Sequence, residues 1–189
     1  MQRQSEIYQS YVRILQEELV PAMGCTEPIS IALAAALARE KLGQVPEKMV
    51  LGVSPNILKN AKSVVVPNTG GMKGIEAALA AGATGGKASL GLEVLSRVTE
   101  EEKEEIRTYL QTASITVEVI ETGHNFDLIL LSCAGEDHVL VRLCDYHTNV
   151  VYLRRNSQVL LDHTEGLDKE DFEEEVEETP APRTGTSSP

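Results

Sequence analysis

The chain has 189 residues, a net charge of -12 and a hydrophobic content of 42%, and it contains no tryptophan. A chain of this length can bury one sizeable core or two small ones. Its longest apolar runs are too short to cross a bilayer, and its excess of acidic residues disfavours nucleic acid and anionic membranes as partners. The N-terminus lacks the basic-then-apolar pattern of a secretion signal, so we expect a cytoplasmic protein with reduced thiols.

Helical patterns fill the first part of the chain. Apolar residues recur at helical spacing, Pro21 gives an end signal for the first helix, and Thr99 gives a start signal for the last. A short apolar segment at 49–55 is a strand or an extended entry to a helix. We predict helices over residues 5–19, 28–42, 56–62, 72–83, 86–98 and 99–112.

The pattern changes near Ala113 to short segments rich in β-branched residues and separated by Gly, Asn or Asp. Such segments are typical of an antiparallel meander. The expected strands lie between residues 114 and 161. The sequence therefore predicts an α+β fold, in which a helical N-terminal half (residues 5–112) is followed by an antiparallel β-meander.

The C-terminal end has a different composition. From Glu165 onward there are nine acidic and two basic residues, followed by a stretch rich in Pro, Ser and Thr. This composition cannot bury enough apolar surface to order itself. We expect one domain over residues 1–163 and an acidic disordered tail over 164–189.

The segment "VPAMGCTEPISIALAAA" places Cys25 just before a helix start signal. The partial positive charge of a helix N-terminus favours a thiolate, which suits both metal ions and electrophiles. A lone cysteine is as often a small buried hydrophobe. Cys25 is therefore a candidate metal ligand, a candidate nucleophile or a core residue.

The segment "PNTGGMKG" is a glycine-rich turn before a helix. Asn68, Thr69, the amides of Gly70 and Gly71, and Lys73 could hold a small anion such as a carboxylate. A tight turn between packed helices explains the same residues. The related segment "GATGGKAS" lacks the spacing of a nucleotide-binding loop.

The segment "CDYHTNVV" contains two further candidates. Cys144 and His147 have the spacing of a zinc-ligand pair, but no second close pair accompanies them. His147, Thr148 and Asn149 are three consecutive polar residues at a strand entry, where they could converge on a ligand or be solvated.

Taken together, "VPAMGCTEPISIALAAA", "VPNTGGMKGIEAALAAGATGG" and "DYHTNVV" resemble the N-terminal portion of the L-cysteine desulfidase family, which is related to the α chain of iron-sulfur L-serine dehydratases. The resemblance implies an α,β-elimination that converts L-cysteine to sulfide, ammonia and pyruvate with a [4Fe-4S] cluster. It makes Cys25 one of three cluster ligands and makes Lys73 and His147 the candidate acid and base. Substrate would contact Asn68, Thr69, Gly70, Gly71, Thr148 and Asn149.

Members of that family are longer and carry their other two cluster cysteines in a C-terminal region. The resemblance therefore implies a homo-oligomer or a complementary C-terminal subunit. Two other hypotheses remain open. One is a non-catalytic fragment or subunit that binds an amino acid or a partner, and the other is an enzyme that uses Cys25 as a nucleophile.

Overall fold

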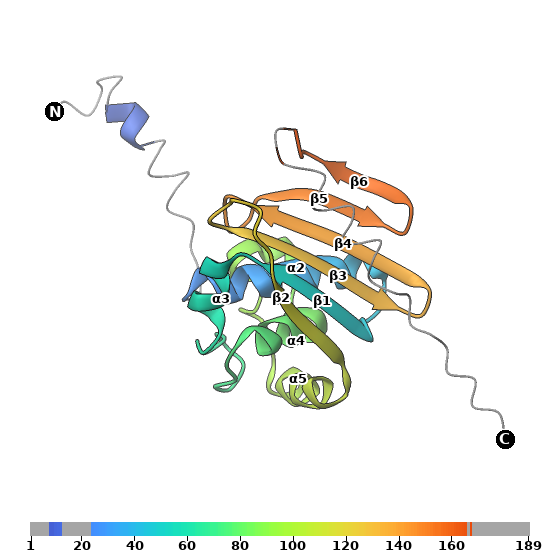
Figure 1. The fold of residues 1–189 in the computed structure, drawn as a ribbon. Helices are drawn as coiled ribbons and strands as arrows, with labels where there is room; N and C mark the ends of the chain where they lie inside the picture. The colour runs from blue at the N-terminus through green and yellow to red at the C-terminus, as the bar shows by residue number, and fades with distance from the viewer. Residues whose placement is uncertain (1–7, 13–23, 166, 168–189) are drawn as a thin grey trace.

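The computed structural model describes residues 8–12, 24–165 and 167 (Figure 1). Within the helix predicted over 5–19, residues 8–12 are helical. The rest of that helix, and all but three residues of the predicted acidic tail over 164–189, lie outside the described residues.

The described strands form one six-stranded sheet. Along the chain, helices precede the first strand and connect it to the second. The helices are α2 (Thr26–Leu42), α3 (Pro55–Ala61), α4 (Ile75–Gly85), the 3-10 helix η1 (Ala88–Glu93) and α5 (Glu100–Thr112). The strands are β1 (Lys48–Val53), β2 (Ser114–Val119), β3 (Asp127–Ala134), β4 (Asp137–Cys144), β5 (Val150–Arg155) and β6 (Gln158–Asp162). Their order in the sheet is β2-β1-β3-β4-β5-β6.

The predicted division into a helical half and an antiparallel meander is wrong. Strand β1 lies within the helical half, pairs in parallel with β2 and pairs antiparallel with β3, so the sheet is mixed. Parallel neighbours need a long crossover connection, and α3, α4, η1 and α5 supply it between β1 and β2. The inward residues Met49, Leu51 and Val53 of β1 are fully buried, as the inner part of a sheet requires.

The helix predicted over 86–98 is also shorter than expected. Its described counterpart is η1, which is interrupted at Gly91 by the non-helical angles φ 55° and ψ -126°. Glycine adopts this left-handed conformation without steric cost, so the chain turns there instead of continuing as an α-helix. The predicted start of α5 is confirmed, because Thr99 and Glu102 form a reciprocal capping box.

Helix α2 is the central helix of the core. It packs against β3 and β4 on one side and against α4 on the other, and α4 packs in turn against α5 (Figure 1). Eleven of its seventeen residues are buried, and many of them are alanines. A helix that is apolar all round belongs inside a protein, and its small side chains allow a close approach to α4.

The opposite face of the sheet is covered at one end by the connection from β2 to β3. Ile120 of this connection packs with Ile129 and Leu140 in a second, smaller apolar cluster. A Cβ atom at Gly52 would lie 2.9 Å from Ile120, so the glycine makes room for the crossing chain. None of the described helices combines the length and apolar character needed to span a membrane.

Candidate functional site

Side chains from three separate segments meet at the N-terminus of α2. Cys25 is the N-cap residue of that helix, and Thr26 and Glu27 are its first two residues. Asn60 comes from α3, and His147 comes from the loop between β4 and β5. All five side chains are partly buried. We call these residues the helix-start cluster.

Glu27 is the hub of the helix-start cluster. Its Oε2 atom accepts a hydrogen bond from the Cys25 thiol at 3.1 Å, and its Oε1 atom accepts one from the Asn60 side-chain amide at 3.0 Å. The Thr26 hydroxyl lies 3.1 Å from His147 Nε2, within hydrogen-bonding distance. The contact between Thr26 and His147 joins residues that are 121 positions apart in the chain.

The loop that carries His147 is held by its own contacts. The His147 ring lies against the ring of Phe126, with 4.6 Å between ring centroids and 56° between ring planes. The Asn149 side-chain amide donates to the carbonyl of Cys144 at 2.9 Å, which closes the loop. These two contacts position His147 beside the start of α2.

The electrostatics of the helix-start cluster favour a protonated thiol and an ionised carboxylate. Burial, together with the hydrogen bond and negative charge of Glu27, raises the pKa of Cys25. Burial alone would raise the pKa of Glu27, but hydrogen bonds from Cys25, its own backbone N–H and Asn60, with the charge of His147, hold that pKa below its usual value. An activated cysteine nucleophile needs a depressed thiol pKa, so this arrangement argues against that hypothesis.

We expect Glu27→Gln to accelerate alkylation of Cys25 by iodoacetamide at a fixed pH near 8. The substitution removes a negative charge that raises the thiol pKa, so a larger fraction of Cys25 is thiolate, the reactive form. Mass spectrometry of the Cys25 peptide over time gives the rate, with Cys133 as the internal control. An unchanged or slower rate at Cys25 would show that Glu27 does not control this thiol.

The predicted glycine turn is built mainly from contacts within the protein. The Asn68 side-chain amide donates to the carbonyls of Leu95 and Val98, and the Thr69 hydroxyl donates to the carbonyl of Val66. Both side chains thus stabilise backbone around the turn. Gly70 and Gly71 are exposed and have left-handed angles, with φ of 72° and 89°.

The turn nevertheless begins beside the helix-start cluster. A Cβ atom at Gly24, the residue before Cys25, would lie 3.4 Å from the Pro67 side chain. Lys73 lies at the other end of the turn, where it is exposed and its backbone pairs with Val65. The structure therefore brings the start of the glycine turn close to Cys25, whereas Lys73 is exposed at the far end of the turn.

Of the remaining predicted residues, one reaches the helix-start cluster and the others do not. Thr148 is exposed, and Asn149 is exposed while its side chain closes the loop around His147. Cys144 is grouped with His124 and Asp145 rather than with His147. His147 is the member of the predicted "HTN" segment that reaches the α2 terminus.

Sequence reasoning missed Glu27 and Asn60. Glu27 stands in the "CTEP" segment, where an acidic residue at the start of a helix already has a sufficient explanation in the helix dipole. Asn60 lies on a seven-residue helix with no motif around it. The position of Asn60 depends on how α3 packs, which no local pattern reveals.

The fold and the cluster together define an α+β domain that presents a thiol, a carboxylate and an imidazole at the start of its central helix. Curated proteins similar to this chain carry the name UPF0597 protein. The chain is 51% identical over 160 residues to the one from Desulfitobacterium hafniense, an alignment that covers 85% of this chain and 37% of that relative. It is 43% identical over 155 residues to the one from Treponema denticola, covering 82% of this chain and 36% of that relative.

A third relative, from Finegoldia magna, is 48% identical over 152 residues, covering 80% of this chain and 36% of that protein. The chain thus spans little more than a third of the length of the curated relatives it matches. No family model and no solved structure matches the chain. The predicted membership of the L-cysteine desulfidase family is wrong, because the matching relatives carry the UPF0597 name, which specifies no reaction.

Proposed function

We propose that the helix-start cluster binds a small amino acid and promotes an α,β-elimination, with L-cysteine as the substrate that yields sulfide, ammonia and pyruvate. The observation that supports this function is the convergence of Cys25, Glu27 and His147 at the N-terminus of a buried helix. Few structural needs explain a thiol, an ionised carboxylate and an imidazole held together by hydrogen bonds at the edge of a core.

An amino acid fits the charges of the cluster. Glu27 stays ionised because its pKa is lowered, so it can pair with the α-ammonium group of the substrate. The positive end of the α2 dipole suits the α-carboxylate. Thr26 directly precedes Glu27 in the sequence, and its hydroxyl can donate a further hydrogen bond to the substrate.

His147 is the proposed base. Its Nε2 atom lies beside the Thr26 hydroxyl, at the same helix terminus as Glu27, whereas Lys73 is an exposed residue of the glycine turn. In the elimination, the Cα proton passes to His147 and the electrons of that bond form the Cα–Cβ double bond. The Cβ–S bond breaks, its electron pair leaves with sulfur, and the sulfide takes a proton from water. The resulting 2-aminoacrylate is hydrolysed to pyruvate and ammonia.

The proposal includes a [4Fe-4S] cluster with Cys25 as one of its ligands. Such a cluster supplies a Lewis-acidic iron when one of its irons lacks a protein ligand. Cys25 fits one ligand position, because its thiol lies at the N-cap of α2 and loses its proton when a metal binds. Among the described residues, Cys133 and Cys144 lie in β3 and β4, so we propose that the other ligands come from a complementary C-terminal segment or subunit.

A second candidate function is amino-acid binding without catalysis. The raised pKa of Cys25 favours it, because binding of an amino acid through Glu27 and the helix terminus needs no thiolate. Both candidates use the same ligand site. In either case we propose a cytoplasmic protein, since the reducing cytoplasm preserves a free thiol such as Cys25.

The test is anaerobic reconstitution of the chain with iron and sulfide in the presence of the part of the Desulfitobacterium hafniense relative that the alignment does not cover, which serves as the complementary segment. Visible absorbance and pyruvate formed from L-cysteine are measured after desalting. We expect iron-sulfur absorbance in the native chain and in the matched control Cys133→Ser but not in Cys25→Ser. Pyruvate formation should fall by about 100-fold or more in His147→Gln, the scale of a lost general base.

Absorbance that survives Cys25→Ser would contradict the assignment of Cys25. A native chain that forms neither absorbance nor pyruvate would contradict elimination by this chain. If L-cysteine still raises its melting temperature, that outcome supports the binding function.

A further inference from the structure

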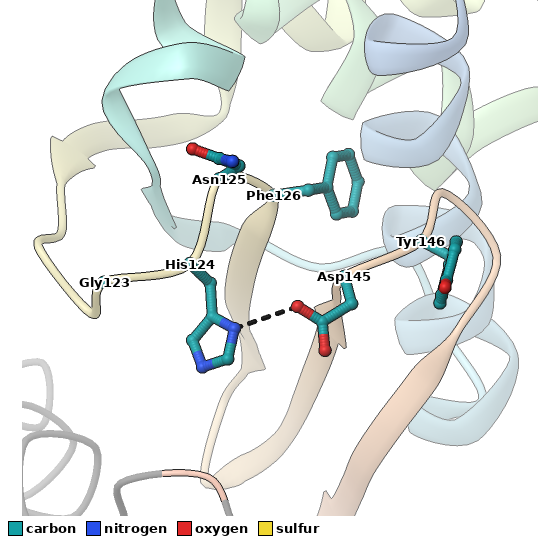
Figure 2. A pocket seen from close by; sticks show the side chains of 6 residues that line it. All are labelled: Gly123, His124, Asn125, Phe126, Asp145 and Tyr146. Atoms are coloured by element: carbon teal, nitrogen blue, oxygen red, sulfur yellow. Dashed lines mark hydrogen bonds and ion pairs between the residues drawn. The ribbon is translucent and has the colours of Figure 1, made fainter.

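A second group of ligand-bearing side chains lies at the pocket that Phe126 also lines. His124 comes from the connection between β2 and β3, Cys144 is the last residue of β4, and Asp145 follows it. One donor atom from each of these three residues lies within 4.8 Å of the other two. Figure 2 shows the His124 and Asp145 side chains pointing toward each other, with 2.9 Å between Nδ1 and Oδ1.

The backbone holds the two segments of this group in register. The Asp145 N–H donates to the carbonyl of Phe126 at 2.9 Å, which ties the start of the β4–β5 loop to the start of β3. Asp145 has a φ of 66°, a left-handed conformation that is uncommon for a residue with a side chain. The arrangement therefore fixes the direction of the Asp145 carboxylate relative to His124.

The three side chains differ in how much of their surface is exposed to solvent. Cys144 is fully buried, whereas the His124 and Asp145 side chains are 27% and 53% exposed. His124 and Asp145 border an open pocket of about 440 Å³. Its lining residues are Gly123, His124, Asn125, Phe126, Asp145 and Tyr146 (Figure 2). A cation can thus approach His124 and Asp145 from solvent and meet the thiol of Cys144 behind them.

We propose that His124, Cys144 and Asp145 form a binding site for a thiophilic divalent cation such as zinc, with the fourth position open to the pocket. Imidazole, thiolate and carboxylate are all zinc ligands, and zinc sites with three protein ligands keep one open position. Bond lengths of about 2.0 to 2.3 Å in a tetrahedral site put neighbouring donors about 3.3 to 3.7 Å apart. The donor atoms of the three residues lie up to 4.8 Å apart, and His124 Nδ1 lies 2.9 Å from Asp145 Oδ1. Side-chain shifts of about 1 Å would bring the thiol closer to the other two donors and move the His124 and Asp145 donors apart, into this range.

The local charge favours a cation. The Asp145 carboxylate acts on the Cys144 thiol, while the opposite charges of Asp127 and Arg142 largely cancel because the two form an ion pair. A cation would replace the His124–Asp145 contact by two metal–ligand bonds and would displace the thiol proton of Cys144 to solvent. This site is independent of the helix-start cluster and does not rest on the proposed elimination.

The experiment titrates the full reduced chain with Co²⁺ and with Zn²⁺ and records cobalt absorbance and zinc affinity. We expect one Co²⁺ with tetrahedral d–d bands and a thiolate-to-cobalt charge-transfer band, which Zn²⁺ removes by displacement. The charge-transfer band should vanish in Cys144→Ser. Zinc affinity should fall at least about tenfold in His124→Gln and Asp145→Asn, since even residues that only orient a ligand contribute that much.

The matched control is the double variant Cys133→Ser/His138→Ala, which removes a cysteine and a histidine that face each other across β3 and β4. It should bind both metals as the native chain does, and so should Cys25→Ser. Because Cys144 is buried, His124→Gln and Asp145→Asn keep the test valid if Cys144→Ser does not fold. The site is overturned if these two variants keep native zinc affinity, or if the cobalt band follows Cys25 or Cys133 instead.

Discussion

We expect Gly82→Ala to lower the free energy of unfolding by more than about 3 kcal/mol, or to prevent folding altogether. A Cβ atom at Gly82 would lie 2.1 Å from the carbonyl oxygen of Ala32 and 2.8 Å from its Cα. Both contacts are with the backbone of α2, so the clash cannot be relieved by a side-chain rotation. Helix α2 would have to move away from α4, and with it the first residues of the helix-start cluster.

Urea unfolding followed by circular dichroism measures this effect. Gly85→Ala is the matched control, because Gly85 belongs to the same helix but its added Cβ would meet side-chain atoms, the nearest being a methyl of Val98 at 3.2 Å. The gain in helix propensity, about 1 kcal/mol, offsets that contact, so we expect a change within about 1 kcal/mol. Equal stability of the two variants would contradict the tight packing of α2 on α4.

We expect Asp127→Asn to destabilise the protein by about 3 to 5 kcal/mol, the cost of breaking a buried ion pair. The Asp127 and Arg142 side chains are 0% and 2% exposed and share two hydrogen bonds, of 3.0 and 2.6 Å. Burial alone lowers the pKa of Arg142, but Asp127 raises it above its ordinary value. Arg142 therefore stays charged, and removal of the carboxylate leaves that charge buried.

The double variant Asp127→Leu/Arg142→Met separates the charge effect from the loss of packing. Apolar residues of similar volume often replace a buried ion pair without loss of stability, so the double variant should be more stable than Asp127→Asn. Urea midpoints of the two variants and the native chain give the comparison. If the double variant is the less stable of the two, the pair contributes mainly through its hydrogen bonds to the surrounding structure, including the one from Thr122 at 2.6 Å.

The parts of the fold that were predictable from the sequence are those specified by local chemistry. Thr99 and the acidic residues after it mark the start of α5, because a capping box involves residues three positions apart. The place of β1 was not predictable in this way. Its parallel partner β2 begins more than 60 residues later, and the pairing depends on the crossover helices.

The candidate site, too, was predictable from the sequence only where local chemistry specifies it. Cys25 and His147 were recognisable because thiols and imidazoles are rare and reactive, but their meeting at the start of α2 depends on how the β4–β5 loop packs on Phe126. Asn68 and Thr69 looked like ligand-binding residues because glycine-rich turns often bind anions. In the folded chain their side chains bond to backbone carbonyls instead.

The central claim is that a small amino acid binds at the helix-start cluster, and the most direct measurement is an NMR titration with L-cysteine that follows asparagine side-chain amides. Asn60 donates to Glu27 in the cluster, and Asn68 donates to Leu95 and Val98 in the glycine turn, so the two amides report on the two sites. We predict a saturable shift of the Asn60 signals that is absent in Glu27→Gln, with Asn68 unchanged. A shift at Asn68 alone, or none at Asn60 up to millimolar L-cysteine, would contradict the claim.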